Sequence, residues 1–411
     1  MGRREMPDWG VIPVAIGCQQ MTIPGTTSFA GNPSDSDGRL RFASARQVLE
    51  DAIEARAFPG CAFGVMARGE VFQGALGRFT YEQDFPAVAE TVVDTVFDVA
   101  SLTKVVATTA AAMLLEQRGQ LDLDTLLGDL LPGFVIGRAP GDPARSVTLR
   151  HLLAHNSGLP GYVKFFEFAD TPYLLFRACL ELKLETEPGA RTEYSDPGFI
   201  LLGKALEVLL REHLPGWVRR EVFAPLGMSA TGFRPVPEER AAIPPTEEDS
   251  WFRKRRIQGE VQDENAWVLG GAAGHAGLFS NVPDLLRFAA AVLRAQVGGG
   301  ADRPESHLPE HHLSKRPLFD RATVESFARR QGPKGSSRAL GWDTPSEKSS
   351  AGRHFSPHSI GHLGYSGCSL WIDLDAEAAI VLLTNRTWPD RQSQLIRTVR
   401  PAFHDAVRAA L

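Results

Sequence analysis

The 411-residue sequence is poor in cysteine. Its four cysteines, Cys18, Cys61, Cys179 and Cys368, lie far apart, so neither a CxxC pair nor the spacing of a zinc ribbon occurs. Four widely spaced cysteines in a chain this long do not predict the disulfide scaffold that staples small secreted domains. The compartment therefore cannot be deduced from the thiols.

Long apolar runs and an excess of basic charge are also missing. No run of about 18 apolar residues occurs, so no helix is predicted to span a membrane. Lys and Arg number 44 and Asp and Glu number 49, which gives a net charge of −5 and argues against a general nucleic-acid binder. The GxGxxG, P-loop and GxSxG patterns are absent, so the sequence predicts neither a nucleotide cofactor nor an α/β-hydrolase nucleophile elbow.

The N-terminal 40 residues predict a leader outside the folded body. Arg3 and Arg4 precede a short apolar stretch that ends at Cys18, which faintly resembles a signal peptide with a lipid-attachment cysteine. Acidic residues interrupt its basic part and Pro13 breaks its apolar part. These interruptions favour a cytoplasmic protein over a periplasmic or exported one. Residues 19–40 are rich in Gly, Ser, Thr, Pro and Asp and predict a loose segment.

The hydrophobic pattern gives strands at both ends of the chain and helices in the middle. At the ends it predicts a helix over Ser44 to Ala57, strands over Cys61 to Ala67, Val71 to Leu76, Ser369 to Asp373 and Ala378 to Thr384, and a last helix over Asp390 to Ala410. In the middle it predicts helices over Lys104 to Gln117, Arg150 to Ala154 and Gly198 to Arg211, with loops over Arg234 to Arg256 and Pro333 to His354. This order predicts an α/β (α+β) unit, residues 41–100 plus 290–411, with a mostly helical domain, residues 101–289, inserted between its halves.

Ser101 and Lys104 are the leading candidates for catalysis. In Ser101-Leu-Thr-Lys104 the spacing of three places both side chains on one face at the start of the buried helix. A lysine whose pKa is depressed can take the proton of a serine hydroxyl, and the helix N-terminus would stabilise a developing oxyanion. The structural alternative is an N-cap serine followed by a surface lysine.

Two further patterns have the residue types of a catalytic site. Tyr194-Ser-Asp196-Pro precedes a predicted helix, and a tyrosine near a lysine can act as a general acid or base. Gly361-His362-Leu363-Gly364-Tyr365-Ser-Gly leads into the C-terminal strands, where glycines would let a substrate lie against an edge strand. The structural alternatives are a tyrosine packed at a helix start and a glycine-rich entry to a hairpin.

With these three patterns in this order, the chain resembles the superfamily of serine β-lactamases and penicillin-binding proteins, in its class C-like esterase and DD-peptidase branch. The family's SxxK, YxN and KTG or HTG become SLTK, YSD and HLG here. The resemblance spans about residues 45 to 410. It implies an antiparallel sheet flanked by helices, an all-helical domain, and an active site between the two.

The resemblance also implies the roles of single residues. Ser101 would be the acylated nucleophile, Lys104 its activator and Tyr194 the proton carrier to the leaving group. The backbone N–H groups of Ser101 and Tyr365 would form the oxyanion hole, and His362 stands where the family has lysine or histidine. Asp196, His362 and Gly364 would contact substrate, without metal or cofactor.

Two departures from the family pattern bear on the substrate. Asp196 replaces an asparagine, and a carboxylate beside Lys104 would raise the lysine's pKa. Leu363 replaces the threonine whose hydroxyl binds a substrate carboxylate, and His362 is only partly charged near neutral pH. These changes favour a less anionic ester or amide over a β-lactam or a D-Ala-D-Ala peptide.

The sequence therefore predicts a serine hydrolase that acts through an acyl-enzyme on small ester, amide or peptide substrates. A DD-carboxypeptidase or weak β-lactamase is the alternative, and a non-catalytic relative that binds peptidoglycan fragments or a protein partner stays open. His151 and His155 have the i, i+4 spacing of zinc ligands, but the glutamate of HExxH is missing, so a structural role is expected. Likewise Arg253 to Arg256 predicts a solvated basic loop. The oligomeric state is not predicted.

Overall fold

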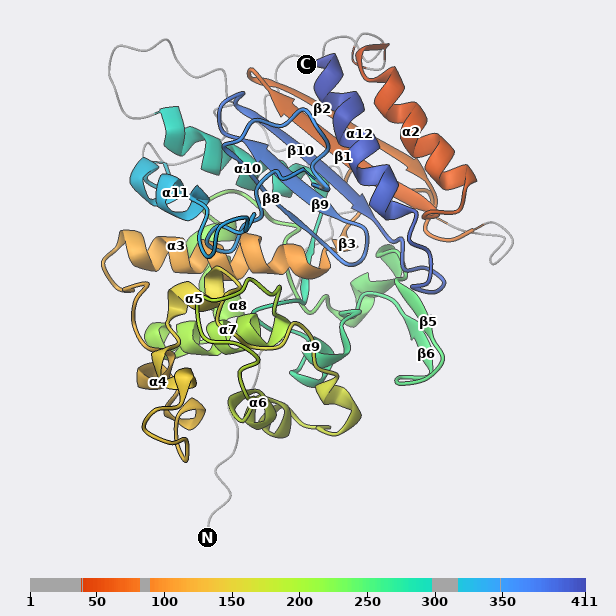
Figure 1. Cartoon of the computed structure of the whole chain (residues 1–411). Helices are drawn as coiled ribbons and strands as arrows, with labels where there is room; N and C mark the ends of the chain where they lie inside the picture. Colours follow the sequence, from red (N-terminus) through yellow and green to blue (C-terminus); the bar gives the residue numbers. More distant parts are fainter. Residues whose placement is uncertain (1–37, 39, 82–88, 298–316, 348) are drawn as a thin grey trace.

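The computed structural model describes residues 38, 40–81, 89–297, 317–347 and 349–411. Figure 1 shows a sheet with helices on both faces and, below it, a mostly helical region that is crossed by a horizontal helix, α3 (Ala110–Gln117). The predicted leader, residues 1–40, lies outside the described residues except for positions 38 and 40. Within the described ranges, none of the helices has the length and apolar character needed to cross a bilayer.

A five-stranded antiparallel sheet joins the two ends of the chain. Its order is β2-β1-β10-β9-β8. The strands are β1 (Gly60–Ala67), β2 (Glu70–Gly77), β8 (Ser359–Leu363), β9 (Ser369–Asp373) and β10 (Ala378–Thr384). β1 pairs with β10 so that Cys61 lies opposite Thr384 and Ala67 opposite Ala378. The four predicted strands are confirmed, and β8 adds an edge that the hydrophobic pattern had not marked as a strand.

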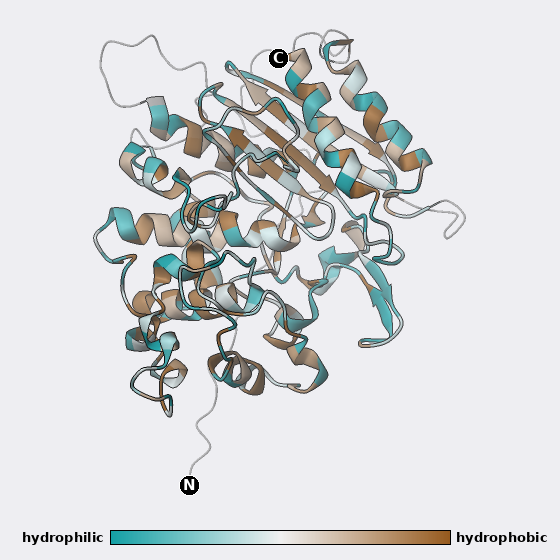
Figure 2. Cartoon of the chain, in the orientation of Figure 1, coloured by the Kyte–Doolittle hydropathy of each residue, from teal (hydrophilic) through white to brown (hydrophobic). Residues whose placement is uncertain are grey.

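The two faces of the sheet are buried in separate cores, because alternate residues of a strand point in opposite directions. Phe63 and Val65 of β1 pack with α2 (Ala43–Glu54) and α12 (Ile396–Ala410), whereas Ala62 and Met66 belong to the main core. In Figure 2, the brown colour of hydrophobic residues runs along these strands.

One helix crosses the predicted domain boundary at residues 289 and 290. The helix α10 (Val282–Val297) packs on β1 and β10 from the main-core side. We therefore propose that the sheet unit starts again at Val282 rather than at residue 290.

The helical half confirms the predicted middle helices. A π-helical stretch, Lys104–Thr109, runs into α3, and Gly119 follows with a positive φ of 67°. The other helices of this half are α4 (Leu127–Leu130), α5 (Leu149–Leu153), α6 (Pro172–Leu180), α7 (Asp196–Leu210), α8 (Leu214–Val218) and α9 (Glu264–Val268). The helix α11 (Arg321–Ala328) comes from the C-terminal part of the chain and packs against α3 and α10. A small sheet of order β3-β7-β4 links the halves through β3 (Phe97–Asp98), β4 (Gly232–Phe233) and β7 (Leu278–Ser280).

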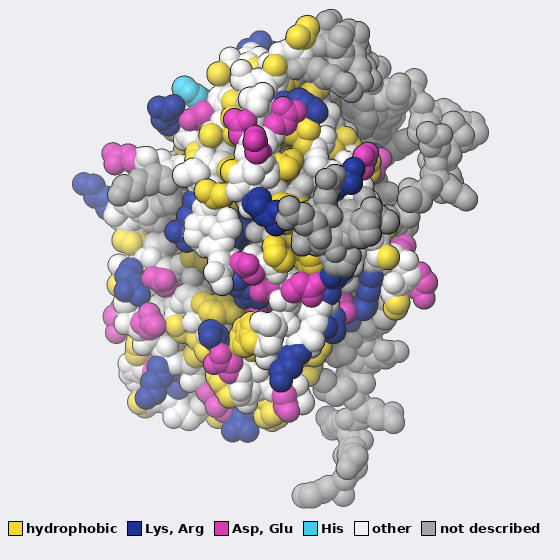
Figure 3. Space-filling model, turned by 90° about the vertical axis from the view of Figure 1, so that its right-hand side faces the viewer, with side chains coloured by type: hydrophobic (Ala, Val, Ile, Leu, Met, Phe, Trp, Pro, Cys, Tyr) yellow, Lys and Arg dark blue, Asp and Glu magenta, His cyan; other side chains and the backbone are white. Residues whose placement is uncertain are grey.

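The prediction of a loop over Arg234 to Arg256 is wrong in part. It contains a 3-10 helix, Pro237–Ala242, and the strand pair β5 (Glu247–Asp249) and β6 (Arg255–Ile257). The side chain of Arg253, expected in a solvated run, is almost fully buried and forms an ion pair of 3.2 Å with Asp249. Local composition predicted a loop because it cannot show that the charges pair with one another. On the face in Figure 3, acidic and basic side chains are likewise interspersed.

Candidate active site

Ser101 lies in a tight 3-10 turn, Ala100–Leu102, directly after β3. Ala100 has a φ of 47°, a left-handed conformation that residues with a Cβ rarely adopt. The buried carboxylate of Asp98 holds this turn: Oδ1 accepts the Ala100 N–H at 2.8 Å and Oδ2 accepts the Gln262 N–H at 2.7 Å. The strained backbone is therefore fixed from two sides, and it positions the serine at a helix start.

Lys104 is fully buried, and its ammonium contacts three oxygens. Nζ lies 3.0 Å from the Ser101 Oγ, 3.0 Å from the carbonyl oxygen of His275 and 2.7 Å from Oδ1 of Asp196. Burial acts to lower the pKa of Lys104, but the Asp196 carboxylate and Tyr194 outweigh it, so that this pKa lies above its ordinary value. The predicted influence of Asp196 on the lysine is confirmed.

Tyr194 covers the Ser101–Lys104 pair. Its ring centroid is 4.9 Å from the Lys104 Nζ and 4.6 Å from the centroid of the His155 ring. Burial raises the pKa of the Tyr194 phenol, while the charge of Lys104 and hydrogen bonds to Lys104 and Ser101 oppose that rise without cancelling it. Since both pKa values are raised, both groups hold their protons at neutral pH in the resting protein.

The start of α7 fixes Tyr194 and Asp196. Ser195 is the N-cap residue: its Oγ accepts the Gly198 N–H at 3.0 Å and donates to the Pro160 carbonyl at 2.7 Å. Its own N–H donates to Nδ1 of His155 at 3.0 Å. Side-chain oxygens satisfy N–H groups that a helix start leaves free, so the sequence itself directs the helix to begin here.

His275 reaches Lys104 because Gly274 has no side chain. A Cβ on Gly274 would lie 2.2 Å from the Phe199 carbonyl oxygen, so only glycine lets this segment pass against α7. The His275 ring contacts Asp263 at 2.9 Å. Burial acts to raise the pKa of Asp263, but His275 and the Ala266 N–H outweigh it and lower this pKa to about 2. A fixed carboxylate thus orients His275, whose carbonyl accepts from Lys104.

The turn after β8 lies against the Ser101 turn. A Cβ on Gly364 would be 2.5 Å from the Val99 carbonyl oxygen, and the Ser366 hydroxyl donates to the Asp98 carbonyl at 2.7 Å. Among the hydrogen bonds of the described residues, none is donated by the Tyr365 N–H. The two backbone N–H groups predicted for an oxyanion hole, those of Ser101 and Tyr365, therefore belong to adjoining turns.

His362 differs from its predicted chemistry. It is buried, with its ring 5.8 Å from that of Tyr194. Burial first, then the charges of Arg338 and Lys104, lower the pKa of His362 well below its ordinary value. The expected partial charge near neutral pH is therefore wrong. Nδ1 lies 2.8 Å from the Leu363 carbonyl, to which it can only donate, so Nε2 is the acceptor of a neutral ring.

Arg338 is the residue that sequence analysis missed. Its guanidinium lies 5.1 Å from the Tyr194 ring centroid and 3.8 Å from Asp343, and it belongs to the predicted loop over Pro333 to His354. One arginine in an irregular segment carries no periodic or spacing signal. It brings a permanent positive charge to a site from which Leu363 removes a donor.

The two histidines with zinc-ligand spacing, His151 and His155, make separate structural hydrogen bonds. His151 completes a capping box with Thr148 at the start of α5, and His155 accepts from Ser195. Three further histidines, His307, His311 and His312, for which the Gly- and Pro-rich sequence predicts a solvated loop, lie outside the described residues.

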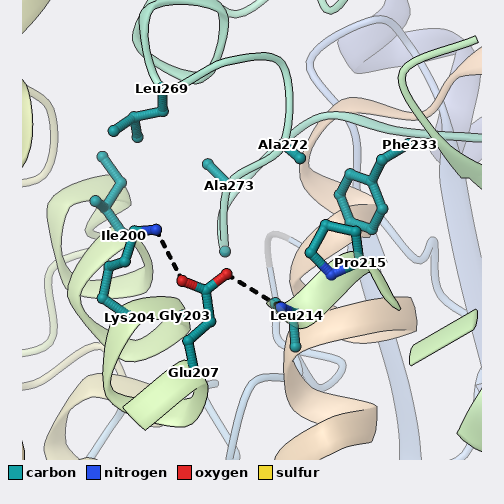
Figure 4. A pocket seen from close by; sticks show the side chains of 11 residues that line it. Ile200, Gly203, Lys204, Glu207, Leu214, Pro215, Phe233, Leu269, Ala272 and Ala273 are labelled. Atoms are coloured by element: carbon teal, nitrogen blue, oxygen red, sulfur yellow. Dashed lines mark hydrogen bonds and ion pairs between the residues drawn. The ribbon is translucent and has the colours of Figure 1, made fainter. Parts of the chain in front are cut away.

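A pocket elsewhere in the helical half, beside α7, contains none of the candidate residues. In Figure 4, Glu207 points toward Lys204, with which it pairs at 2.8 Å, and it accepts the Leu214 N–H at 3.0 Å. Its polar groups are thus used within the fold.

A serine at a helix start, a lysine one turn on, a tyrosine from the helical half and a glycine-rich strand end together define an SxxK-type serine hydrolase. The chain belongs to the Beta-lactamase family, whose profile matches residues 45–400. This confirms the predicted superfamily and its β-lactamase/transpeptidase-like fold.

Two relatives share sequence with this chain, and a solved structure shares its fold. A putative D-alanyl-D-alanine carboxypeptidase of Salmonella typhi is 30% identical over 319 residues, 71% of this chain and 70% of that protein. An N-acetylmuramyl-L-alanine amidase of Bacillus subtilis (strain 168) is 30% identical over 375 residues, 83% of this chain and 80% of that protein. Among solved structures, EstCE1, a hydrolase with promiscuous acyltransferase activity, has a TM-score of 0.66 at 21% identity, covering 90% of this chain and 100% of that one.

Proposed function

We propose that this serine hydrolase acylates Ser101 with small, uncharged ester or amide substrates. The observation that carries the proposal is the 3.0 Å contact between the Ser101 Oγ and the Nζ of the fully buried Lys104. The contacts of Tyr194 with both residues give the same site a second proton carrier.

The chemistry follows from this arrangement. The Ser101 Oγ bonds to the substrate carbonyl carbon and loses its proton to the deprotonated form of the Lys104–Tyr194 pair, and the carbonyl becomes an oxyanion facing the N–H groups of Ser101 and Tyr365. The tetrahedral intermediate then expels the alcohol or amine, which takes that proton through Tyr194. Water attacks the acyl-enzyme by the reverse proton route, releases the acid and regenerates Ser101.

The third pattern indicates the substrate class. Leu363 offers no donor, and the neutral His362 offers no charge at neutral pH. We expect a neutral short-chain aryl ester to be turned over with a higher kcat/KM than nitrocefin or a D-Ala-D-Ala peptide. Leu363→Thr should shift this ratio about tenfold or more toward the anionic substrates, because a hydrogen bond to a charged group contributes about 1.5–3 kcal/mol. Steady-state kinetics on wild type and variant measure the ratio, and a wild type that prefers nitrocefin overturns the ester proposal.

Arg338 favours a second candidate, a DD-carboxypeptidase or weak β-lactamase. A guanidinium beside Tyr194 could bind a substrate carboxylate in place of the missing threonine and lysine. The D-alanyl-D-alanine carboxypeptidase name of the Salmonella relatives points the same way. In the same assay, Arg338→Gln discriminates between the two: a loss of about tenfold or more on the peptide alone supports this candidate. An equal effect on ester and peptide means that Arg338 does not recognise the carboxylate.

Asp196 should set the pH dependence of kcat/KM. The base form requires loss of a proton from Lys104, whose pKa the Asp196 carboxylate raises, so kcat/KM should rise toward alkaline pH. Asp196→Asn removes the negative charge 2.7 Å from Nζ, which lowers that pKa and moves the rising limb to lower pH. pH–rate profiles of the two proteins test this expectation. An unmoved limb would mean that another group limits the reaction.

A further inference from the structure

Arg400 is a buried cation for which the described residues provide no carboxylate at ion-pair distance. It projects from α12 and is 7% exposed. Burial lowers the pKa of its guanidinium to about 10, so it still carries its charge at neutral pH. An unpaired buried charge costs free energy unless it is fully hydrogen-bonded. The presence of this charge in the interior therefore calls for a local structural reason.

Among the residues that the structure describes, the hydrogen-bond partners of the Arg400 side chain are carbonyl groups of the turn that follows β8. Its Nη2 donates to the Gly364 carbonyl at 2.5 Å and to the Cys368 carbonyl at 3.0 Å, and its Nε donates to the Gly367 carbonyl at 3.1 Å. One rigid fork thus holds three carbonyls that lie within five residues of each other. Arg386 holds the intervening Tyr365 carbonyl at 2.7 Å.

The direction of the Gly364 carbonyl sets where the next N–H points, and this carbonyl accepts both from Arg400 and, within the turn, from the Gly367 N–H at 3.0 Å. In a planar trans peptide the C=O and the following N–H point in opposite directions. The carbonyl of Gly364 is turned back toward α12, so the Tyr365 N–H is turned the other way. Gly364 in this turn also lies against the Val99 carbonyl, two residues before Ser101.

We propose that Arg400 is a positioning residue that aims and polarises the Tyr365 N–H as an oxyanion donor. This inference rests on the proposed function, because it presumes that the Tyr365 N–H faces the oxyanion formed at Ser101. A positive charge behind the peptide draws electron density toward its carbonyl, which makes the N–H a better donor. Such a donor acts on the transition state far more than on the bound substrate.

Labelling by a fluorophosphonate tests the inference without knowledge of the natural substrate, because phosphonylation also builds negative charge on an oxygen at the oxyanion hole. Arg400→Gln and Arg400→Lys should each slow the second-order labelling of Ser101 by about tenfold or more, since loss of a whole oxyanion donor costs about 100- to 1,000-fold. On an aryl ester, kcat should fall by a similar factor while KM changes less than about threefold. Arg400→Lys keeps the charge and serves if Arg400→Gln fails to fold.

Arg408→Met is the matched control. Arg408 lies on the same helix and ties it to the sheet through Asp373 at 3.0 Å, away from the turn. Arg408→Met should lower Tm but leave the labelling rate of Ser101 and kcat unchanged. Arg400 variants that lose Tm yet label at the wild-type rate, or that change KM and kcat together, overturn the inference. If the wild type itself is not labelled at Ser101, the proposed function fails first.

Discussion

Ser101→Ala should abolish labelling by a fluorophosphonate and reduce ester turnover by on the order of 1,000-fold or more. In the wild type, the Ser101 Oγ bonds to phosphorus, fluoride leaves, and the serine proton passes to Lys104 or Tyr194. This reaction needs a positioned hydroxyl and a group that can accept its proton, and the Nζ of Lys104, which is that group in its deprotonated form, lies 3.0 Å from the Ser101 Oγ. Intact-mass spectrometry gives the adduct, and peptide mapping places it.

The same experiment separates an enzyme from a binding protein that keeps the site. Ser336 is a control because, within the described part of the chain, its Oγ only accepts hydrogen bonds, from the Thr192 hydroxyl at 3.0 Å and the Arg338 N–H at 3.1 Å. Ser336→Ala should therefore label normally. An adduct on another serine, or full turnover by Ser101→Ala, would remove Ser101 from the mechanism. A wild type that forms no adduct would favour a non-catalytic member of the family.

Lys104→Ala and Tyr194→Phe should each lower kcat by about 100-fold or more, and the double variant should be little worse than the poorer single one. When two groups share one proton path, removing either group already interrupts the path, so removing the second lowers kcat little further. The contacts that motivate this are the Nζ–Oγ distance and the Tyr194 ring over Nζ at 4.9 Å. Steady-state kinetics of the four proteins provide the cycle, and additive losses would assign the two groups to separate steps.

Stability needs its own control in this series. Removing Lys104 leaves the Asp196 carboxylate, which is 16% exposed, without its partner, and breaking such a pair costs about 3–5 kcal/mol. Lys104→Ala with Asp196→Asn removes both charges and should recover much of the unfolding free energy without recovering activity. Recovery of activity together with stability would show that the lysine acts only through folding.

The local parts of this protein are determined by sequence alone. The hydrophobic pattern gave β1, β2, β9, β10 and α7, because apolar runs bounded by turn residues are a property of neighbouring positions. The Ser101–Lys104 spacing is equally local, since one helical turn places the pair together wherever the helix lies. The family followed from three such patterns in a fixed order.

Only the tertiary structure decided the electrostatics of the site. The pKa of His362 depends on burial beneath Tyr194 and on charges from Arg338 and Lys104, none of which is near it in sequence. No local sequence pattern marks Arg338, in a loop, or Arg400, in a helix, as a functional residue. Their roles come from contacts formed across the fold. The dielectric environment and the charges around a group are set by what packs on it, so local sequence fixed the candidate nucleophile, and long-range packing fixed the charges around it.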